Sequence, residues 1–331
     1  MQTAPFDSVP VSDPAARRRL YDSRAFEHLY HYDGPLGAQW TPGATRFALW
    51  APTAQAVRLC LYPDGGGSPA ARTLELHRAG HGVWQCEVPG NWDGCYYDYT
   101  VTDFEGTARR TADPWALACG RDGGRSMVVD LRRTDPAGWA QDRPPAPAPE
   151  DIIYEVHVRD FSWDAASGVP EALRGKYAAF TLNGTTLNGD GIHPTCLDYL
   201  KTLGVTHVQL MPVFDFGSVP EGSDVYNWGY DPVNYNVPEG CYSSDPDDGA
   251  VRIRELKEAV RALHQNGFRV IMDVVYNHTY HLDSWLWRTE PWYFYRQNPD
   301  GTPGDGSACG NDLATERSMC ARYIRESVLY W

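Results

Sequence analysis

The seven residues Tyr226–Pro232 hold the side chains best suited to binding chemistry. Their sequence, YNWGYDP, combines three aromatic rings with one amide, one carboxylate, one glycine and one proline. Flat aromatic faces stack on the weakly apolar C–H faces of sugar rings, and an amide or a carboxylate beside them can hydrogen bond to hydroxyls. The order is too irregular for the core of a strand or a helix. The segment predicts a sugar-contacting loop, and the alternative is an aromatic surface loop without a ligand.

Composition favours a carbohydrate partner over a nucleic acid. The chain has 331 residues, a net charge of −14, and no block rich in Lys or Arg, whereas Trp (12) and Tyr (20) are abundant. A phosphate-backbone partner needs clustered positive charge. No segment reaches transmembrane length, so we expect no membrane partner. The eight cysteines include no C-x-x-C pair, and residues 1–22 contain no apolar run of signal-peptide length. Together these features predict reduced thiols and a cytoplasmic location, although a chain from which the signal had been removed would look the same.

The elements that position this loop fall into several regions. Residues 1–27 read as a loose, polar arm. Residues 28–138 hold short segments of alternating apolar and polar residues separated by turns, which predict a β-sandwich. Their predicted strands are Thr45–Ala51, Ala56–Tyr62, Arg72–His77, Val83–Val88 and Tyr96–Asp103. Residues 139–150 form a Pro/Ala linker that we expect to be stiff and extended.

From 151 to 331 the pattern changes to strands alternating with helices. The predicted strands are Ile152–Val158, Val205–Met211 and Phe268–Tyr276, the last apolar nearly throughout, as expected for a strand covered on both faces. Helices are predicted at Pro194–Leu203, between Ile253 and Leu263, and along an apolar stripe in Arg317–Trp331. This is the opening of a (β/α)8 barrel, in which active sites lie at the carboxyl ends of the strands. The fold class is therefore a β-sandwich followed by about three of the eight strands of a TIM barrel.

Several segments resemble the α-amylase superfamily of glycoside hydrolases. YNWGYDP resembles the signature of type I pullulanases, and Asp273–His278 (DVVYNH) resembles the first conserved region of the superfamily. Tyr154–Phe161 and Gly204–Val213 resemble its first two strands, and Gly306–Asp312 resembles a pullulanase loop. The sandwich resembles the module that precedes the barrel in debranching enzymes. In that family it packs on the barrel and sometimes binds glucan, so a structural and a binding role are both open.

The resemblance implies roles for six substrate-binding residues. Tyr230 would be a platform under the sugar in the cleavage subsite, His278 would donate a hydrogen bond to that sugar, and both are expected at an open cleft. Asp273 would orient an arginine at the end of strand four. Trp228 is either a second platform or a buried anchor of the loop, whereas Asn227 and Asp231 either read hydroxyls or shape the turn.

Neither a metal nor a cofactor is assigned. Asn277 matches a position that ligates calcium in many α-amylases, but debranching relatives often lack that site. The acidic stretch Asp245–Asp248 lacks EF-hand spacing and is better explained as a solvated turn and helix start.

The resemblance places the catalytic carboxylates on strands four and five, beyond residue 331. We expect the parent protein to hydrolyse α-1,6 linkages of pullulan, limit dextrins and glycogen with retention, and this chain alone, a truncated part of it, to be inactive. An open three-stranded sheet should expose its edges and apolar faces. The alternatives are an isoamylase-type or glycogen-debranching enzyme, for which YNWGYDP is less typical, and a non-catalytic glucan-binding protein.

Overall fold

The computed structural model describes residues 13–331, which divide into two compact units. The first unit holds the chain up to Val129 together with Asp231–Asn236 and Tyr276–Trp331. The second unit holds Asp130–Tyr230 and Val237–Val275. The first boundary between the units lies between Val129 and Asp130, before the sequence-based boundary at 139–150, and the chain later crosses back into the first unit twice.

Two short helices precede the sandwich. Helix α1 spans Pro14–Tyr21 and helix α2 spans Arg24–Tyr30. The prediction of a loose arm is wrong for these residues, whereas residues 1–12 lie outside the described part of the chain. Asp13 accepts from the backbone N–H of Ala15 and so caps α1, while buried Phe26 anchors α2. Helices this short depend on tertiary packing, which local patterns do not reveal.

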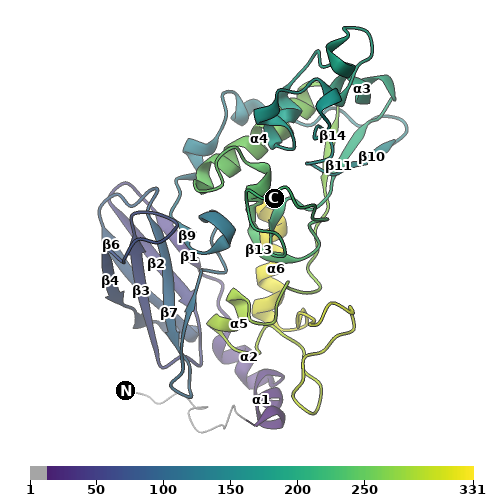
Figure 1. Cartoon of the computed structure of the whole chain (residues 1–331). Coiled ribbons are helices and arrows are strands. Elements are labelled where there is room, and N and C mark those ends of the chain that lie inside the picture. Colours follow the sequence, from purple (N-terminus) through teal and green to yellow (C-terminus); the bar gives the residue numbers. More distant parts are fainter. Residues whose placement is uncertain (1–12) are drawn as a thin grey trace. The chain divides into compact units, whose positions relative to one another are not determined.

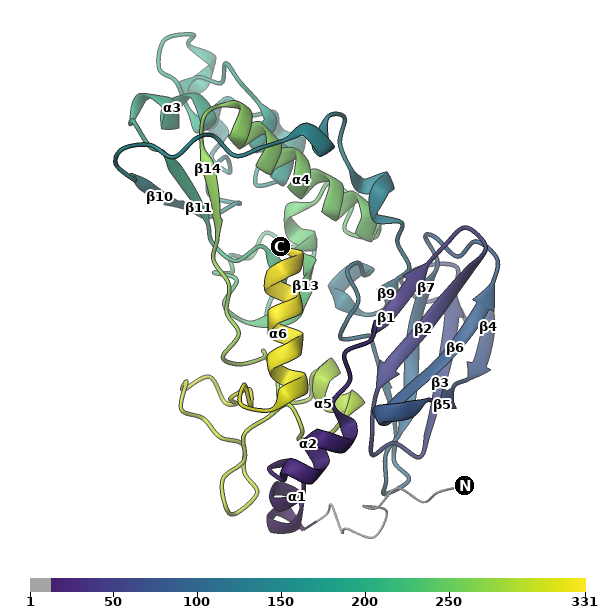
Figure 2. The same cartoon turned by 180° about the vertical axis from the view of Figure 1, so that it is seen from behind.

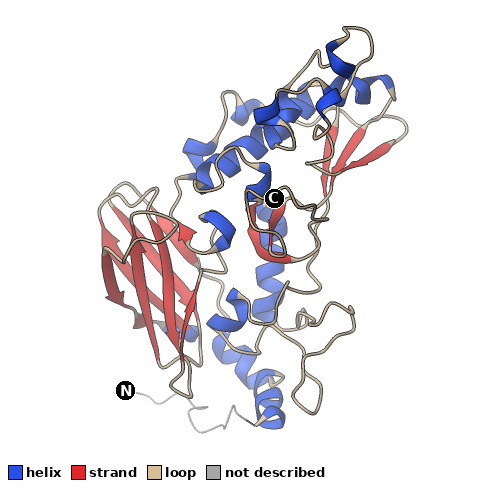
Figure 3. Cartoon of the chain, viewed as in Figure 1, coloured by secondary structure: helices blue, strands red, loops and turns tan. Residues whose placement is uncertain are grey.

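The β-sandwich of the first unit consists of two antiparallel sheets (Figures 1 and 3). The strand order is β1-β2-β6-β5 in one sheet and β4-β3-β7-β8 in the other, where β9 also pairs with β7. The strands are β1 (Gly37–Trp40), β2 (Ala44–Trp50), β3 (Ala56–Tyr62), β4 (Arg72–Glu75), β5 (His77–Arg78), β6 (Val83–Pro89), β7 (Tyr96–Thr102), β8 (Ala108–Thr111) and β9 (Ser126–Met127). The predicted sandwich is confirmed, except that the strand expected at Arg72–His77 divides between the two sheets.

The sandwich core explains why these segments alternate. Inward-facing side chains such as Phe47, Leu59, Val88 and Tyr97 are buried in one hydrophobic cluster. Side chains on successive positions of a strand point to opposite faces, so every second residue joins the cluster. Figure 2 shows the strands of the sandwich from behind.

The rest of the first unit is helical and irregular. It contains α5 (Trp285–Thr289) and α6 (Ser318–Tyr330). The helix expected in Arg317–Trp331 is confirmed, but the expected apolar stripe is not its buried face. Helix α6 buries Met319, Cys320 and Tyr323, whereas Val328, which belongs to the stripe, is 54% exposed. The indole Nε1 of Trp115 donates to Oε2 of Glu326 over 2.9 Å, which ties α6 to the segment between β8 and β9.

The second unit contains a three-stranded parallel sheet in the order β10-β11-β14 (Figure 2). Its strands are β10 (Ile153–Val156), β11 (His207–Leu210) and β14 (Arg269–Met272), and its helices are α3 (Cys196–Thr202) and α4 (Gly249–Gln265). The predicted strand and helix alternation is therefore confirmed. Asp248 caps α4 by accepting from the N–H of Ala250, so the acidic stretch Asp245–Asp248 is a turn and helix start, as predicted.

The remaining elements are short. Strands β12 (Phe214–Phe216) and β13 (Pro232–Pro238) follow β11 along the chain. One-turn 3-10 helices occur at Gly80–Gly82, Arg121–Gly123, Leu131–Thr134, Trp139–Gln141, Ala165–Ser167, Glu171–Leu173, Tyr177–Thr181, Leu187–Gly189 and Gly240–Tyr242. In the described residues no helix has the length and apolarity needed to span a membrane. The eight cysteines are free thiols.

The parallel sheet exposes the surfaces that neighbouring strands would cover. In β10, Ile153 is 54% exposed, and the four residues of β14 are only half-buried. The prediction that this last strand is covered on both faces is wrong, because β14 is a sheet edge with β11 as its single neighbour. The expectation of exposed edges and apolar faces is confirmed.

Candidate functional site

Tyr230 and Asp273 form the centre of the candidate site in the second unit. Asp273 directly follows β14, at the carboxyl end of the parallel sheet. The hydroxyl of Tyr230 donates to Oδ2 of Asp273 over 2.8 Å. Partial burial, followed by that hydrogen bond and the charge of Asp273, raises the pKa of Tyr230 to about 12. The hydroxyl therefore stays protonated at neutral pH and keeps donating to the carboxylate.

The aromatic rings of the segment are accessible. Tyr230 is 37% exposed and Trp228 is 61% exposed. The ring of Trp228 meets Tyr226 edge-on, with 5.6 Å between the ring centroids. The alternative that Trp228 is a buried loop anchor is therefore wrong, because most of its side chain lies at the surface. Exposed aromatic faces are the groups that stack on sugar rings.

Asn227 and Gly229 shape the turn that carries these rings. Oδ1 of Asn227 accepts from the N–H of Gly229 over 2.8 Å, and its amide nitrogen donates to Oγ of Ser218 over 2.9 Å. Gly229 has φ +87°, and a Cβ there would lie 3.0 Å from the carbonyl oxygen of Pro212. Asn227 was expected either to read sugar hydroxyls or to shape the turn, and these contacts show that it shapes the turn. Glycine is required at 229 because the turn is left-handed and close-packed.

His157 supports the same turn, and sequence reasoning did not single it out. The N–H of Asp160 donates to Nδ1 of His157 over 3.4 Å, so the ring proton is placed on Nε2, which donates to the carbonyl of Asn227 over 2.8 Å. Burial lowers the pKa of His157, which favours this neutral form. The hydroxyl of Tyr242 lies 3.1 Å from the same nitrogen. The only sequence feature that could have indicated this role was the presence of a histidine inside the predicted strand Ile152–Val158.

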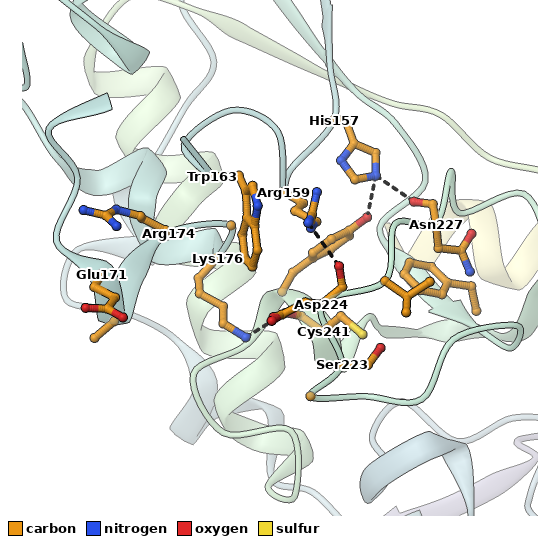
Figure 4. A pocket seen from close by; sticks show the side chains of 16 residues that line it. His157, Arg159, Trp163, Glu171, Arg174, Lys176, Ser223, Asp224, Asn227 and Cys241 are labelled. Carbon is orange, nitrogen blue, oxygen red and sulfur yellow. Dashed lines mark hydrogen bonds between the residues drawn. The ribbon is translucent and has the colours of Figure 1, made fainter. Parts of the chain in front are cut away.

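A pocket of about 510 Å³ opens beside Asn227 (Figure 4). Arg159 donates to the carbonyl of Asp224 over 3.1 Å, and its guanidinium lies 3.9 Å from the ring centre of Trp163. Across the pocket, Nζ of Lys176 donates to the carbonyl of Cys241 over 2.8 Å. Aromatic, cationic, amide and carboxylate groups thus line a single concavity of ligand-binding size.

A buried cluster of carboxylates lies next to this pocket in the fold. Oxygens of Asp215, Glu221 and Glu239 lie within 4.8 Å of one another. Nη1 of Arg252 lies 2.7 Å from Oε1 of Glu221 and 3.6 Å from Oδ1 of Asp215. Burial, then the charge of Glu221, raises the pKa of Glu239 to about 7. Because an arginine already occupies the cluster, we interpret it as a structural ion-pair network, and we assign it no metal.

The other two predicted residues, Asp231 and His278, belong to the first unit. Asp231 is half-buried. His278 is 6% exposed, its Nδ1 lies 2.7 Å from Oδ1 of Asn277, and its carbonyl accepts from the hydroxyl of Tyr235. The expectation that His278 lies at an open cleft is therefore wrong, because these contacts hold it inside the packed loop. Of the six predicted residues, the structure joins Tyr230 to Asp273 directly.

Hydrogen bonds from the segment Gly306–Asp312 hold the loop that carries His278. The amide nitrogen of Asn311 donates to the carbonyl of Thr279 over 2.7 Å, and its Oδ1 accepts from the N–H of Thr279 over 3.0 Å. This two-way bond joins the segment Gly306–Asp312 to the loop that follows the DVVYNH motif.

Two parts of the chain match known protein families. Residues 35–116 match carbohydrate-binding module 48 (isoamylase N-terminal domain), and residues 180–297 match the alpha amylase catalytic domain. The pullulanase of Bacillus subtilis strain 168 is 40% identical over 314 residues, covering 93% of this chain and 42% of that protein. The chain belongs to the pullulanase group of the α-amylase family. It spans about two fifths of that relative's length.

Solved structures agree with this assignment. The pullulanase of Paenibacillus barengoltzii in complex with maltohexaose and alpha-cyclodextrin is 43% identical, with a TM-score of 0.90 over 94% of this chain and 49% of that one. The glycogen debranching enzyme of Klebsiella pneumoniae strain 342 is less similar, at 28% identity over 90% of this chain and 48% of that protein. The resemblance of YNWGYDP to pullulanases is therefore confirmed at the level of the family. The predicted sandwich and three parallel strands are confirmed as well.

Proposed function

We propose that this chain forms part of a debranching glycoside hydrolase that cuts α-1,6 linkages in branched α-glucans such as pullulan, limit dextrins and glycogen. The observation that carries the proposal is the exposed ring of Tyr230, whose hydroxyl is held by Asp273 at the carboxyl end of a parallel strand. In barrels of this kind the reaction takes place at that end of the strands.

Within this proposal, the residues of the second unit hold the sugar. The Tyr230 ring is an apolar platform of fixed orientation, because its hydroxyl cannot turn away from Asp273 without losing a hydrogen bond. Trp228 supplies a second exposed ring on the same turn. Restricting the platform before the ligand arrives lowers the entropy lost on binding. Asp231 is proposed either to read sugar hydroxyls or to shape the turn, whereas His278, which is 6% exposed, is no longer among the proposed contacts.

We assign bond cleavage to residues that follow this chain in the parent protein. A retaining glycosidase needs two carboxyl groups about 5–5.5 Å apart, one as nucleophile and one as acid and base. Among the described residues, the buried trio Asp215, Glu221 and Glu239 is closely grouped, but Arg252 fills it and no substrate reaches it. The proposal therefore gives this chain substrate holding, with both catalytic groups on later strands.

A second candidate function is glucan binding without catalysis. The match of residues 35–116 to a carbohydrate-binding module favours it, and so do the exposed aromatic rings. In this alternative the sandwich is the only functional part, so glucan binding would not depend on the turn that carries Tyr230.

The test of sugar binding at the turn, which separates the two candidates, is electrophoresis of the folded chain in native gels that contain pullulan. We expect pullulan to retard the chain, and we expect Trp228→Ala and Tyr230→Ala to reduce the retardation. Ile192→Ala is the control, because Ile192 is a 76% exposed apolar residue of the same unit that lines neither the pocket beside Asn227 nor the one beside Tyr226. Equal retardation of all variants would contradict the proposed site.

A further inference from the structure

The pocket of about 510 Å³ in the second unit has a positive lining, although the whole chain carries a net charge of −14. The lining includes three cations and two carboxylates, namely Arg159, Arg174, Lys176, Glu171 and Asp224 (Figure 4). The three cations are half-buried, whereas both carboxylates are exposed. The excess positive charge therefore lies inside the pocket, where a bound anion would be partly removed from water and attracted more strongly.

Two of the cations extend from the residues on either side of Gly175 in the sequence. Gly175 has φ +71°, and a Cβ there would lie 3.0 Å from Cε3 of Trp163. Its N–H donates to Oγ of Ser162 over 2.9 Å. The left-handed backbone and the close approach of the indole require glycine at this position. These contacts fix the backbone from which Arg174 and Lys176 extend.

The third cation, Arg159, is held by the same indole. Its guanidinium lies 3.9 Å from the ring centre of Trp163. Its Nη2 donates to the carbonyl of Asp224 over 3.1 Å, and its Nη1 lies 3.3 Å from Oδ1 of Asp160. Stacking on the ring and these two bonds restrict the guanidinium plane. A cation that is held in place beforehand loses less entropy when a ligand binds.

Arg174 and Lys176 each use one donor to hold the loop. Nε of Arg174 donates to the carbonyl of Val169 over 2.9 Å, and Nζ of Lys176 donates to the carbonyl of Cys241 over 2.8 Å. Within the described residues, the terminal nitrogens of Arg174 and two of the three ammonium protons of Lys176 have no further protein acceptor. An arginine fork and a lysine ammonium are the donors that bind phosphate oxygens.

The pocket also has an apolar surface beside these donors. Trp163, which lines it, is 40% exposed, and aromatic faces stack on sugar rings. Asn227, which shapes the proposed sugar-binding turn, lines the same pocket. A ligand with a sugar ring and a phosphate group therefore fits the lining better than a bare anion does.

We propose that this pocket binds a phosphate monoester carried by a sugar, so that the parent enzyme recognises phosphorylated glucose units of its glucan. The choice of a glucan as the carrier rests on the proposed function, whereas the phosphate chemistry of the pocket does not. A free sugar phosphate and a phosphorylated glucan share this chemistry, and separate ligands distinguish them.

The test is isothermal titration of the folded chain at low ionic strength, because salt screens the attraction between charges. The ligands are inorganic phosphate, glucose 6-phosphate and maltohexaose that carries a phosphate on one glucose unit. We expect glucose 6-phosphate to bind more tightly than inorganic phosphate, since the ring adds contact with Trp163. Phosphorylated maltohexaose should bind more tightly than either, and Tyr230→Ala should reduce only that further gain.

Four variants test the lining. Arg174→Gln and Lys176→Gln should each weaken glucose 6-phosphate binding by about tenfold or more, because charged hydrogen bonds to the phosphate are lost. Glu171→Gln should strengthen it by about twofold to fivefold, because a repelling charge is removed at the exposed rim. Arg254→Gln is the matched control, since Arg254 is an exposed arginine on α4 of the same unit and does not line the pocket.

The outcomes separate this proposal from the proposed function. Absence of binding by both glucose 6-phosphate and inorganic phosphate would overturn the pocket, and so would unchanged binding in both Arg174→Gln and Lys176→Gln. Neither result would affect the turn at Tyr230, which is tested with unphosphorylated pullulan. Loss of glucose 6-phosphate binding in the two pocket variants, but not in Arg254→Gln, would support the pocket even if pullulan were not bound.

The ligand series decides what carries the phosphate. Equal affinity for glucose 6-phosphate and inorganic phosphate would overturn the contact with a sugar ring. Phosphorylated maltohexaose that binds no more tightly than glucose 6-phosphate would overturn the glucan as the carrier. If one of the two pocket variants unfolds, the other still decides.

Discussion

Tyr230 and Asp273 are 43 residues apart in sequence, and one hydrogen bond of 2.8 Å joins their side chains. The bond links the turn Tyr226–Tyr230 to the end of the parallel strand β14. It leaves the ring 37% exposed while fixing the position of its hydroxyl. The hydrogen bond therefore restricts the motion of an aromatic ring that lies on a loop. The predictions about the site depend on this restriction.

The first prediction separates the ring of Tyr230 from its hydroxyl. Tyr230→Phe keeps the stacking face and loses one hydrogen bond, worth about 0.5–1.5 kcal/mol. We expect maltotriose affinity to fall by about twofold to tenfold, and we expect Tyr230→Ala to lose more because the ring is gone as well. Titration calorimetry measures both. An unchanged affinity in Tyr230→Ala, with the melting temperature unchanged, would show that the ring does not meet the sugar.

The second prediction concerns Gly229. Gly229→Ala places a Cβ on a backbone with φ +87° and only 3.0 Å from Pro212. The left-handed backbone alone costs about 1–2 kcal/mol. We expect the turn to shift, with loss of both stability and pullulan retardation in native gels.

The matched control for that change is Gly204→Ala. Gly204 has φ +69°, and a Cβ added there would meet no atom within 4 Å. Its substitution carries the backbone cost without the contact, so it should lower the melting temperature and leave glucan binding intact. Equal binding in the two variants would mean that the geometry of the turn is not needed for the ligand.

The third prediction is a pH dependence of stability from Asp113. Burial raises the pKa of Asp113 to about 6, although the N–H of Trp115 and the hydroxyls of Tyr97 and Tyr99 donate to it. The folded state therefore keeps this proton while the unfolded state, with a pKa of 3.8, releases it. The stabilisation is complete below about pH 4 and is lost as the pH rises to about 6, by up to about 3 kcal/mol.

Asp113→Asn tests this assignment because an amide keeps the shape of the carboxyl and does not titrate. Urea denaturation at pH 4, 5, 6 and 7 should give a flatter profile for the variant than for the natural chain. Glu290, whose pKa burial raises to about 7, should still contribute a decline in both proteins. Parallel profiles would show that Asp113 does not hold its proton in the folded state.

The fourth prediction concerns local stability. The strands β2, β3, β6 and β7 surround a closed hydrophobic cluster, whereas β10 and β14 are sheet edges with exposed or half-buried side chains. Amide protection follows the free energy of local opening. We expect the sandwich amides to exchange more slowly than those of β10 and β14 in hydrogen-exchange mass spectrometry. Equal protection would mean that another surface covers the edges of the parallel sheet.

The sequence was sufficient for the elements whose patterns are local. Strict alternation predicted the sandwich strands, and apolar runs at Ile152–Val158 and Val205–Met211 predicted the parallel strands. YNWGYDP predicted an aromatic surface, which the exposure of Trp228 confirms. These features follow from side-chain periodicity and turn chemistry, both of which depend on consecutive residues.

The features that sequence reasoning missed depend on residues far apart in the chain. The bond from His157 to the carbonyl of Asn227 spans 70 positions, and the ion pair of Arg252 with Glu221 spans 31. The burial of His278 also escaped prediction; its carbonyl accepts from the hydroxyl of Tyr235, which is 43 positions away. No local pattern specifies which buried polar groups will meet.

The most direct test of the central claim is the release of maltotriose from pullulan. The chain should be assayed alone and as part of a protein that carries the complete catalytic domain. We predict no release above buffer from the chain alone and maltotriose as the product of the complete protein, reduced by Tyr230→Ala. Turnover that copurifies with the chain alone, or a complete protein that leaves the α-1,6 linkages of pullulan intact, would contradict the account.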